Sequence, residues 1–264
     1  MRRLILPVLL SAVVSAQPPS FDVVSIKPNK SGSLSMSVGV RSGRFNAVNA
    51  TALTLVQNAY SQQTFHIFGA PGWMDAERYD VSATITPVVT PTREQFQAMM
   101  RTMLADRFKL VARVETREMP AYVMTLARSD RKLGPRIRPW DVDCRAVWSG
   151  EIKNPPPSSV PGIPPCGGRG GAGLHAQSGQ NMEGLARSLE SYLSAKVIEQ
   201  TELKGQWEIH LQWDAGQPRI DGGQPSEFGS LFTALQEQLG LKLEARRLPV
   251  EVLVIDKVER PSEN

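Results

Sequence analysis

Apolar residues recur at helical spacing in two long stretches of the chain. In residues 93–108 they follow the i, i+3, i+4, i+7 and i+8 rule, and residues 227–240 nearly repeat the pattern. Thr92 and Gln95 have the spacing of a capping box, and Gly240 is typical of a helix C-terminus. Both stretches are therefore predicted to be amphipathic helices, with a methionine-rich face filling the core.

Strict alternation of apolar and polar residues predicts strands elsewhere. In residues 207–213 and 79–85, every second side chain is apolar and shares one face. Residues 250–255 are apolar on both faces, which indicates a strand covered on both sides.

The order of these patterns occurs twice along the chain. Each half gives a strand, a helix, two strands and a helix, and then ends in two further strands. Pro120 and Pro249 lie 129 residues apart, each just before a predicted last strand. The matching segments are 45–49, 51–60, 65–70, 79–85 and 93–108 in the first half, and 174–178, 181–193, 196–200, 207–213 and 227–240 in the second. We predict an α+β protein of two tandem, related β-α-β-β-α-β-β halves, each a mixed sheet with helices packed on it.

A proline- and glycine-rich segment separates the halves and is predicted to form no regular core element. It contains the only two cysteines, Cys144 and Cys166, whose spacing is far from the C-x-x-C of metal and redox pairs. We predict a disulfide that pins this connector. The predicted segments are a signal peptide (1–16), a first repeat (17–133), the connector (134–173) and a second repeat (174–264).

Gly168, Gly170 and Gly173 spell the G-x-G-x-x-G pattern of dinucleotide-binding sites. That pattern works where a strand enters and a helix leaves, so that the pyrophosphate meets a helix N-terminus. Here prolines precede the glycines and a predicted strand follows. The glycines are interpreted as flexible connector, and no cofactor is implied.

The N-terminus has the features of a secretory signal peptide. Arg2 and Arg3 precede an apolar run that ends in small residues at Ala16, so cleavage is expected before Gln17. The run is too short to span a membrane, and no later stretch is long and apolar enough. We expect a periplasmic or secreted protein. Its net charge falls from +4 to about +2 on cleavage, which is too balanced to indicate nucleic-acid binding.

Three common catalytic motifs are absent from the sequence, and Ser129 and Lys132 match the S-x-x-K of acyl enzymes only formally, because they follow a predicted strand and not a helix start. The sequence contains no H-E-x-x-H, G-x-S-x-G or P-loop pattern. The three histidines, His66, His175 and His210, fall in predicted strands or at their edges, where packed or surface roles are commoner than catalysis. No catalytic, cofactor-binding or metal-ligating residue is therefore assigned.

Two alternatives rest on residues 128–145. Asp141 and Asp143 lie near Trp140 and Trp148, which suggests a carbohydrate-active or other hydrolytic enzyme, although both tryptophans could instead pack the connector. The stretch is also rich in basic residues, which suggests binding to an anionic polymer, or a solvated connecting segment. The candidate ligand contacts are Trp140, Trp148, Arg131, Lys132, Arg136 and Arg138.

Five collinear blocks resemble a large family of exported proteins of unknown function from acidobacteria and other soil bacteria. They are FDVVSIKPN (21–29), GRFNAVNATALTLVQNAYS (43–61), GAPGWMDAERYDV (69–81), MLADRFKLVARVETREMPAYVM (103–124) and SLFTALQEQLGLKLEARRLPVEVLVIDKVERPSEN (230–264). Similar domains are attached to membrane metallopeptidases of the beta-lactam-sensing type. The resemblance implies a role in sensing or partner binding in the bacterial envelope.

One turn departs from the family pattern. Where relatives have aspartate-x-threonine-glycine-leucine, this chain has Glu199-Gln200-Thr201-Glu202-Leu203. Glycine's positive φ is expected to be unavailable at Glu202, which puts any role tied to that turn in doubt. The sequence favours a non-enzymatic module that binds another envelope protein or a cell-wall component, and it leaves the oligomeric state open.

Overall fold

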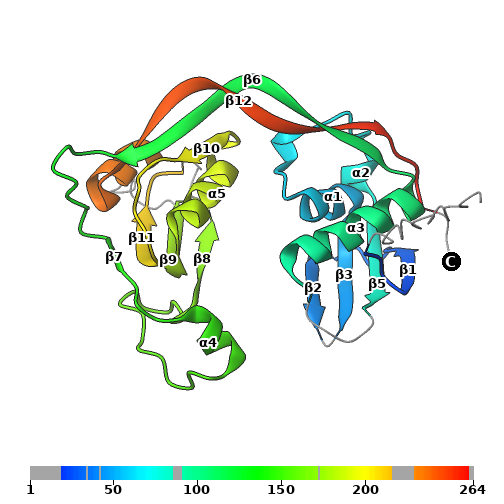
Figure 1. Cartoon of the computed structure of the whole chain (residues 1–264), viewed down its shortest axis with the longest axis horizontal. Helices are drawn as coiled ribbons and strands as arrows, with labels where there is room; N and C mark the ends of the chain where they lie inside the picture. Colours follow the sequence, from blue (N-terminus) through cyan, green and yellow to red (C-terminus); the bar gives the residue numbers. More distant parts are fainter. Residues whose placement is uncertain are drawn as a thin grey trace, which may run out of the picture. The chain divides into compact units, whose positions relative to one another are not determined.

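The structure is a computed structural model whose described part confirms the α+β prediction (Figure 1). The described residues are 19–33, 35–41, 43–85, 91–171, 173–215 and 229–261. The expected signal peptide, residues 1–16, lies outside them. Within these ranges the chain forms three four-stranded sheets, and none of the described helices has the length and hydropathy to cross a membrane.

The chain divides into two compact units. One comprises residues up to Glu115 together with Val252 and beyond, and the other comprises Thr116–Glu251. Their boundaries fall inside two long strands, β6 (Val111–Leu126) and β12 (Leu241–Lys257), so each strand contributes to both units.

An antiparallel sheet of order β1-β5-β3-β2 forms one side of the first unit. Phe45 and Ala47 are buried in β3, whereas Arg44 and Asn46, which alternate with them, are exposed, as the alternation predicts. The strands are β1 (Val23–Pro28), β2 (Ser37–Arg41), β3 (Arg44–Thr51) and β5 (Arg78–Thr84).

Helices cover the apolar face of this sheet (Figure 1). The predicted capping box forms at α3: Thr92 Oγ1 accepts from Gln95 N at 3.2 Å, and Gln95 Oε1 accepts from Thr92 N at 2.8 Å. The remaining elements of the first unit are α1 (Ala52–Tyr60), a 3-10 turn η1 (Thr64–His66), β4 (Ile67–Phe68), α2 (Trp73–Ala76) and α3 (Arg93–Phe108).

The second unit contains a sheet of order β7-β11-β9-β8. Part of the helix expected at 227–240 lies outside the described residues, and the remainder is α6 followed by a π-helical turn that ends at Gly240, φ 70°. The elements are β7 (Ile137–Pro139), α4 (Cys144–Ser149), β8 (Gly167–Gly171), β9 (Leu174–Gln180), α5 (Met182–Leu193), β10 (Lys196–Glu199), β11 (Trp207–Gln212), α6 (Leu231–Ala234) and η2 (Leu235–Leu239).

Two strands were expected at the end of each half, but in each half they form one continuous strand. β6 runs through Pro120 and β12 runs through Pro249 without interruption. The neighbour β10 pairs with β6 only from Ala121 onward, so Pro120 lies beyond the end of β10. In the same way, β4 pairs with β12 only at Leu253 and Val254. Neither proline therefore removes a hydrogen bond to β10 or to β4.

The last part of each long strand packs in the unit formed by the opposite half of the chain. Met124 of β6 lies in the core of the second unit, where β6 pairs in parallel with β10. Leu253 and Ile255 of β12 lie in the core of the first unit, where β12 pairs in parallel with β4. The two compact units are defined by packing, which does not show whether the two halves share an ancestor. The duplication and its boundaries at 133/134 and 173/174 therefore stay predictions.

The connector has more regular structure than expected. Ile137–Pro139 and Gly167–Gly171 are edge strands at opposite sides of the second unit's sheet, and α4 lies between them in the chain. Only glycine fits at position 168, because a Cβ there would overlap the carbonyl oxygen of Ala176 on β9. The predicted Cys144–Cys166 disulfide is confirmed.

Candidate functional site

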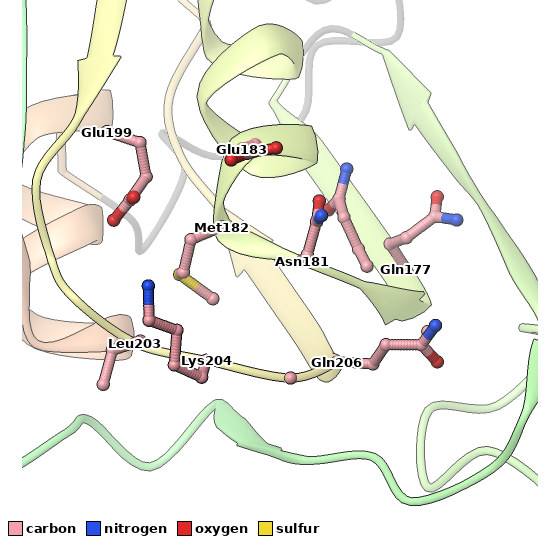
Figure 2. A pocket seen from close by; sticks show the side chains of 11 residues that line it. Gln177, Asn181, Met182, Glu183, Glu199, Leu203, Lys204 and Gln206 are labelled. Atoms are coloured by element: carbon pink, nitrogen blue, oxygen red, sulfur yellow. The ribbon is translucent and has the colours of Figure 1, made fainter. Parts of the chain in front are cut away.

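A pocket of about 530 Å³ lies in the second unit, beside the N-terminus of α5 (Figure 2). One wall is the end of β9 and the start of α5, residues 177–183. The other wall is Glu199 and the turn 203–206, which leads from β10 to β11. Its size falls within the range of ligand pockets in proteins, roughly 300–1,000 Å³.

The α5 wall is fixed by a helix cap. Asn181 has extended backbone angles, and its Oδ1 accepts from Gly184 N at 2.9 Å. Gln180, the preceding residue, is held by a 2.7 Å contact to the His175 ring and by its 3.2 Å bond to Ser188. The side chains on this wall therefore have a defined position before any ligand arrives.

The opposite wall is the turn for which the sequence predicts a departure from the pattern of similar proteins. Glu199 Oε1 accepts from Thr201 N and Oγ1 at 2.6 and 2.5 Å, and Thr201 Oγ1 accepts from Leu203 N at 3.2 Å. Glu202 adopts φ 61°, the left-handed conformation that glycine adopts more easily. The expectation that Glu202 cannot supply this conformation is wrong, because the bonds on either side of it hold the turn.

The connector supports the pocket from behind. Trp140 N donates to Gln206 O at 2.8 Å, which ties the turn to the connector. Gly179 lies against the Cys144 sulfur and adopts φ 77°. The disulfide thus lies next to the pocket wall and holds the connector in contact with it.

A buried carboxylate fixes the other end of the connector. Glu208 on β11 is 2% exposed and accepts from Ser158 Oγ at 2.6 Å and Ser159 N at 2.9 Å. It also accepts from Arg138, Ser159 Oγ and Ser178 Oγ. Burial alone would raise the Glu208 pKa, but the hydrogen bonds from Arg138, Ser158 and Ser159 outweigh it and lower the pKa to about 2.

The pocket offers both hydrogen-bond donors and acceptors. Figure 2 shows Glu199, Leu203 and Lys204 at the left of the pocket in this view, and Gln177 and Gln206 at the right. Four of the lining side chains form no hydrogen bond or ion pair with any residue in the described ranges: Gln177, Glu183, Lys204 and Gln206. Two amides, a carboxylate and an ammonium group are thus available to a ligand.

None of the described lining residues is His, Cys, Ser, Thr or Tyr. Among them, no hydroxyl, thiol or imidazole group is therefore available as a nucleophile. Nor is there an aromatic ring among them on which a sugar could stack. Across the described ranges, no group of three or more His, Cys, Asp or Glu side chains is arranged to hold a metal ion.

The two candidate tryptophans have different surroundings. Trp140 is 7% exposed and lies under the Arg138 guanidinium, whose central carbon is 5.7 Å from the ring centre. Trp148 on α4 is 70% exposed, and its Nε1 donates to Cys166 O at 3.4 Å. Arg138 and Trp140 are therefore brought together, whereas Trp148 is presented to solvent.

The candidate carboxylates Asp141 and Asp143 are both exposed and do not line the pocket. Asp143 is the N-cap of α4, and its Oδ1 accepts from Arg145 N at 2.9 Å and Ala146 N at 3.3 Å. This local bonding accounts for an aspartate at that position without catalysis.

Several basic residues of 128–145 are engaged with neighbouring side chains. Arg128 pairs with Asp130 at 2.6 Å, and Arg131 pairs with Glu202 at 3.3 Å. Arg138 pairs with Glu208, and Arg136 Nη1 donates to Gln212 Oε1 at 2.6 Å. Lys132, by contrast, is exposed, and its backbone N donates to Asp130 at 3.2 Å. The stretch is therefore not a continuous surface of unpaired positive charge.

A family model described as "Protein of unknown function (DUF3738)" matches residues 53–258. The chain belongs to the DUF3738 family. The match covers most of the chain and includes every residue that lines the pocket. No curated protein and no solved structure matches the chain.

The residues that line the pocket of this DUF3738 protein were not predicted from the sequence. Its residues come from two segments, 177–183 and 199–206, whose proximity depends on how β9, α5 and β11 pack. One signal was available, since Glu199 and Leu203, where a departure from the family pattern is predicted, both line the pocket. Because no catalytic motif points to that turn, its position beside α5 could be seen only in the structure.

Proposed function

We propose that this DUF3738 protein is a non-enzymatic binding module that is exported to the bacterial envelope and holds a polar, peptide-like segment of a partner in the α5 pocket. The observation that supports this function is a set of polar side chains that form no hydrogen bond or ion pair with other described residues: Gln177, Glu183, Lys204 and Gln206. Amide side chains present a donor and an acceptor together, which matches the pair that a peptide group presents.

The charges on the two walls favour a ligand with both signs of charge. Lys204 lies on the turn, and the positive end of the α5 dipole faces the same space, so a carboxylate is favoured there. Glu183 and Glu199 favour a nearby cationic group. A peptide segment supplies both kinds of group, whereas a uniformly anionic polymer would meet the two glutamates unfavourably.

Side-chain recognition is favoured over strand addition next to the pocket. The outward-facing amide of Val197 on the edge strand β10 already donates to Glu190 Oε1 at 3.3 Å. Glu190 is buried and also pairs with Lys196 at 2.7 Å. An incoming strand would have to displace these bonds, which is a common way of protecting a sheet edge.

Export and an envelope partner rest on the sequence features and on the disulfide, which persists in oxidising compartments. The predicted relation to domains of beta-lactam-sensing metallopeptidases agrees with this location.

Affinity capture from the envelope fraction of the source bacterium tests the function. We expect wild-type protein to retain a reproducible partner, and Lys204→Glu to lower its recovery by at least about tenfold. Lys153→Glu is the matched control, because Lys153 is exposed in the connector and makes the same charge change away from the pocket. Equal recovery with both variants would place the partner elsewhere and contradict the proposal.

A further inference from the structure

A second pocket, of about 330 Å³, adjoins the α5 pocket in the second unit. It lies between residues 183–190 of α5 and residues 196–199 of β10, and we call it the β10 pocket. Glu183 and Glu199 line both pockets, and Figure 2 shows them at the upper edge of the α5 pocket in this view. A ligand in one pocket can therefore extend into the other.

Most of the charged side chains that line the β10 pocket are already held by neighbouring groups. Glu190 is buried, pairs with Lys196 at 2.7 Å and accepts from Val197 N at 3.3 Å. Glu199 accepts from Thr201 N at 2.6 Å on the far side of the strand end. These bonds fix the shape of the pocket and leave Glu190 and Lys196 compensating each other.

Glu183 and Arg187 are the charged groups that remain for a ligand. Both are exposed, and neither forms a hydrogen bond or ion pair with any residue in the described ranges. They lie four residues apart on α5, a spacing that permits an ion pair, yet they do not pair with each other. One negative and one positive charge are therefore available side by side on the same helix face.

The edge of β10 adds main-chain groups to this pocket. Val197 N donates to Glu190 on the open edge of the strand, whereas Gln200 N donates to Met124 O on the edge that pairs with β6. Because backbone groups alternate between the two edges of a strand, the N–H and C=O of Glu199 lie on the open edge. One donor and one acceptor there match the pair that a peptide group presents.

We propose that the partner segment held in the α5 pocket continues in extended form into the β10 pocket, where Glu183 and Arg187 bind a basic and an acidic side chain two residues apart. The inference rests on the proposed function and specifies its ligand. Residues four apart on a helix are separated by about 6 Å along its axis. Residues two apart on an extended segment are separated by about 6.6 Å and point to the same side. The two spacings match, whereas adjacent residues of an extended segment point to opposite sides.

Nuclear magnetic resonance of the full chain tests this ligand with synthetic peptides. Each capped peptide of serine and threonine carries one lysine and one glutamate, either two residues apart, in both orders, or adjacent. The amide signals of Gln206 and Arg187 report on the α5 pocket and the β10 pocket separately. We expect saturable shifts at both positions with the two-residue spacing, and about three- to fivefold weaker binding of the adjacent pair.

The outcomes separate this inference from the proposed function. Shifts at Gln206 without shifts at Arg187, or equal affinities for the two spacings, would overturn the inference and leave the function standing. If neither signal shifts, the inference is wrong, and the affinity capture with Lys204→Glu decides the function by itself.

A charge reversal at Arg187 makes the result specific. Arg187→Glu should bind a peptide with two lysines, two residues apart, about three- to fivefold more tightly than the lysine–glutamate peptides, whereas wild type should show the opposite preference. Lys153→Glu makes the same charge change in the exposed connector and should keep the wild-type preference. If Arg187→Glu does not fold, Arg187→Gln replaces it and should abolish the preference. A preference that is the same in wild type and in the Arg187 variant would overturn the proposal.

Discussion

Gly179 packs against the Cys144 sulfur with no room for a side chain between them. The glycine belongs to the wall of the α5 pocket, and the cysteine belongs to the connector. A Cβ at Gly179 would overlap the sulfur, and φ 77° is unfavourable for any residue with a side chain. The pocket and the disulfide therefore form one packed assembly.

Gly179→Ala should lower the free energy of unfolding by about 2–5 kcal/mol, from left-handed strain and overpacking together. Urea denaturation measures it. Gly171→Ala is the control, because a Cβ there meets open space and the backbone has no positive φ; its effect should stay within about 0.5 kcal/mol. Equal effects of the two substitutions would show that the close contact is not present.

Replacing both cysteines with serine should lower the free energy of unfolding by about 3 kcal/mol, as expected for a loop of this length. Hydrogen exchange should accelerate in the connector and at Gly179 and Gln206, because these positions contact it directly. Exchange in β1, β3 and β5 of the first unit should not change. An unchanged pattern at Gly179 would contradict the supporting role of the disulfide.

Glu208→Gln should change how stability depends on pH. The Glu208 pKa is about 2 in the folded chain, below the ordinary value of 4.5, so its contribution is present above pH 4.5 and is lost as the pH falls toward 2. The stability difference between wild type and Glu208→Gln should shrink by about 3 kcal/mol over that interval. Acid denaturation followed by circular dichroism measures it. A difference that does not vary with pH would mean that the carboxylate is not held by Arg138 and the serines.

Glu202→Gly should raise the free energy of unfolding by about 0.5–1 kcal/mol, since relief of left-handed strain exceeds glycine's entropic cost. Glu202→Gln keeps the strain and removes only the exposed pair with Arg131, so it should change stability by less than about 0.5 kcal/mol. Thermal unfolding of both variants provides the comparison. If glycine and glutamine behaved alike, the turn would not be strained.

Periodic patterns predicted the elements that bury one face. The helix at 93–108 and its cap at Thr92 were predicted because the apolar spacing and the capping residues are local signals. The continuity of β6 and β12 was not, since it depends on where the short neighbours β10 and β4 begin and end. That fact concerns a neighbour distant in sequence, which local patterns do not contain.

The connector and the pocket show a second limit. Gly167–Gly171 has no side-chain alternation, yet it forms a strand by pairing with β9. At Gly168 the two strands lie so close together that only glycine fits. The pocket is lined by amides that have no periodic signature. The disulfide, by contrast, was predictable, because the chain contains only two cysteines and their spacing excludes the usual metal and redox pairs.

Site-specific photocrosslinking tests the binding pocket most directly. A photoreactive amino acid replaces Gln206, inside the pocket, or Lys153, in the exposed connector, and each protein is irradiated in intact envelopes of the source bacterium. We expect one reproducible adduct from position 206, to a polar segment of a partner protein, and its absence from position 153. Identical adducts from both positions, or none from position 206, would contradict a partner-binding role for the α5 pocket.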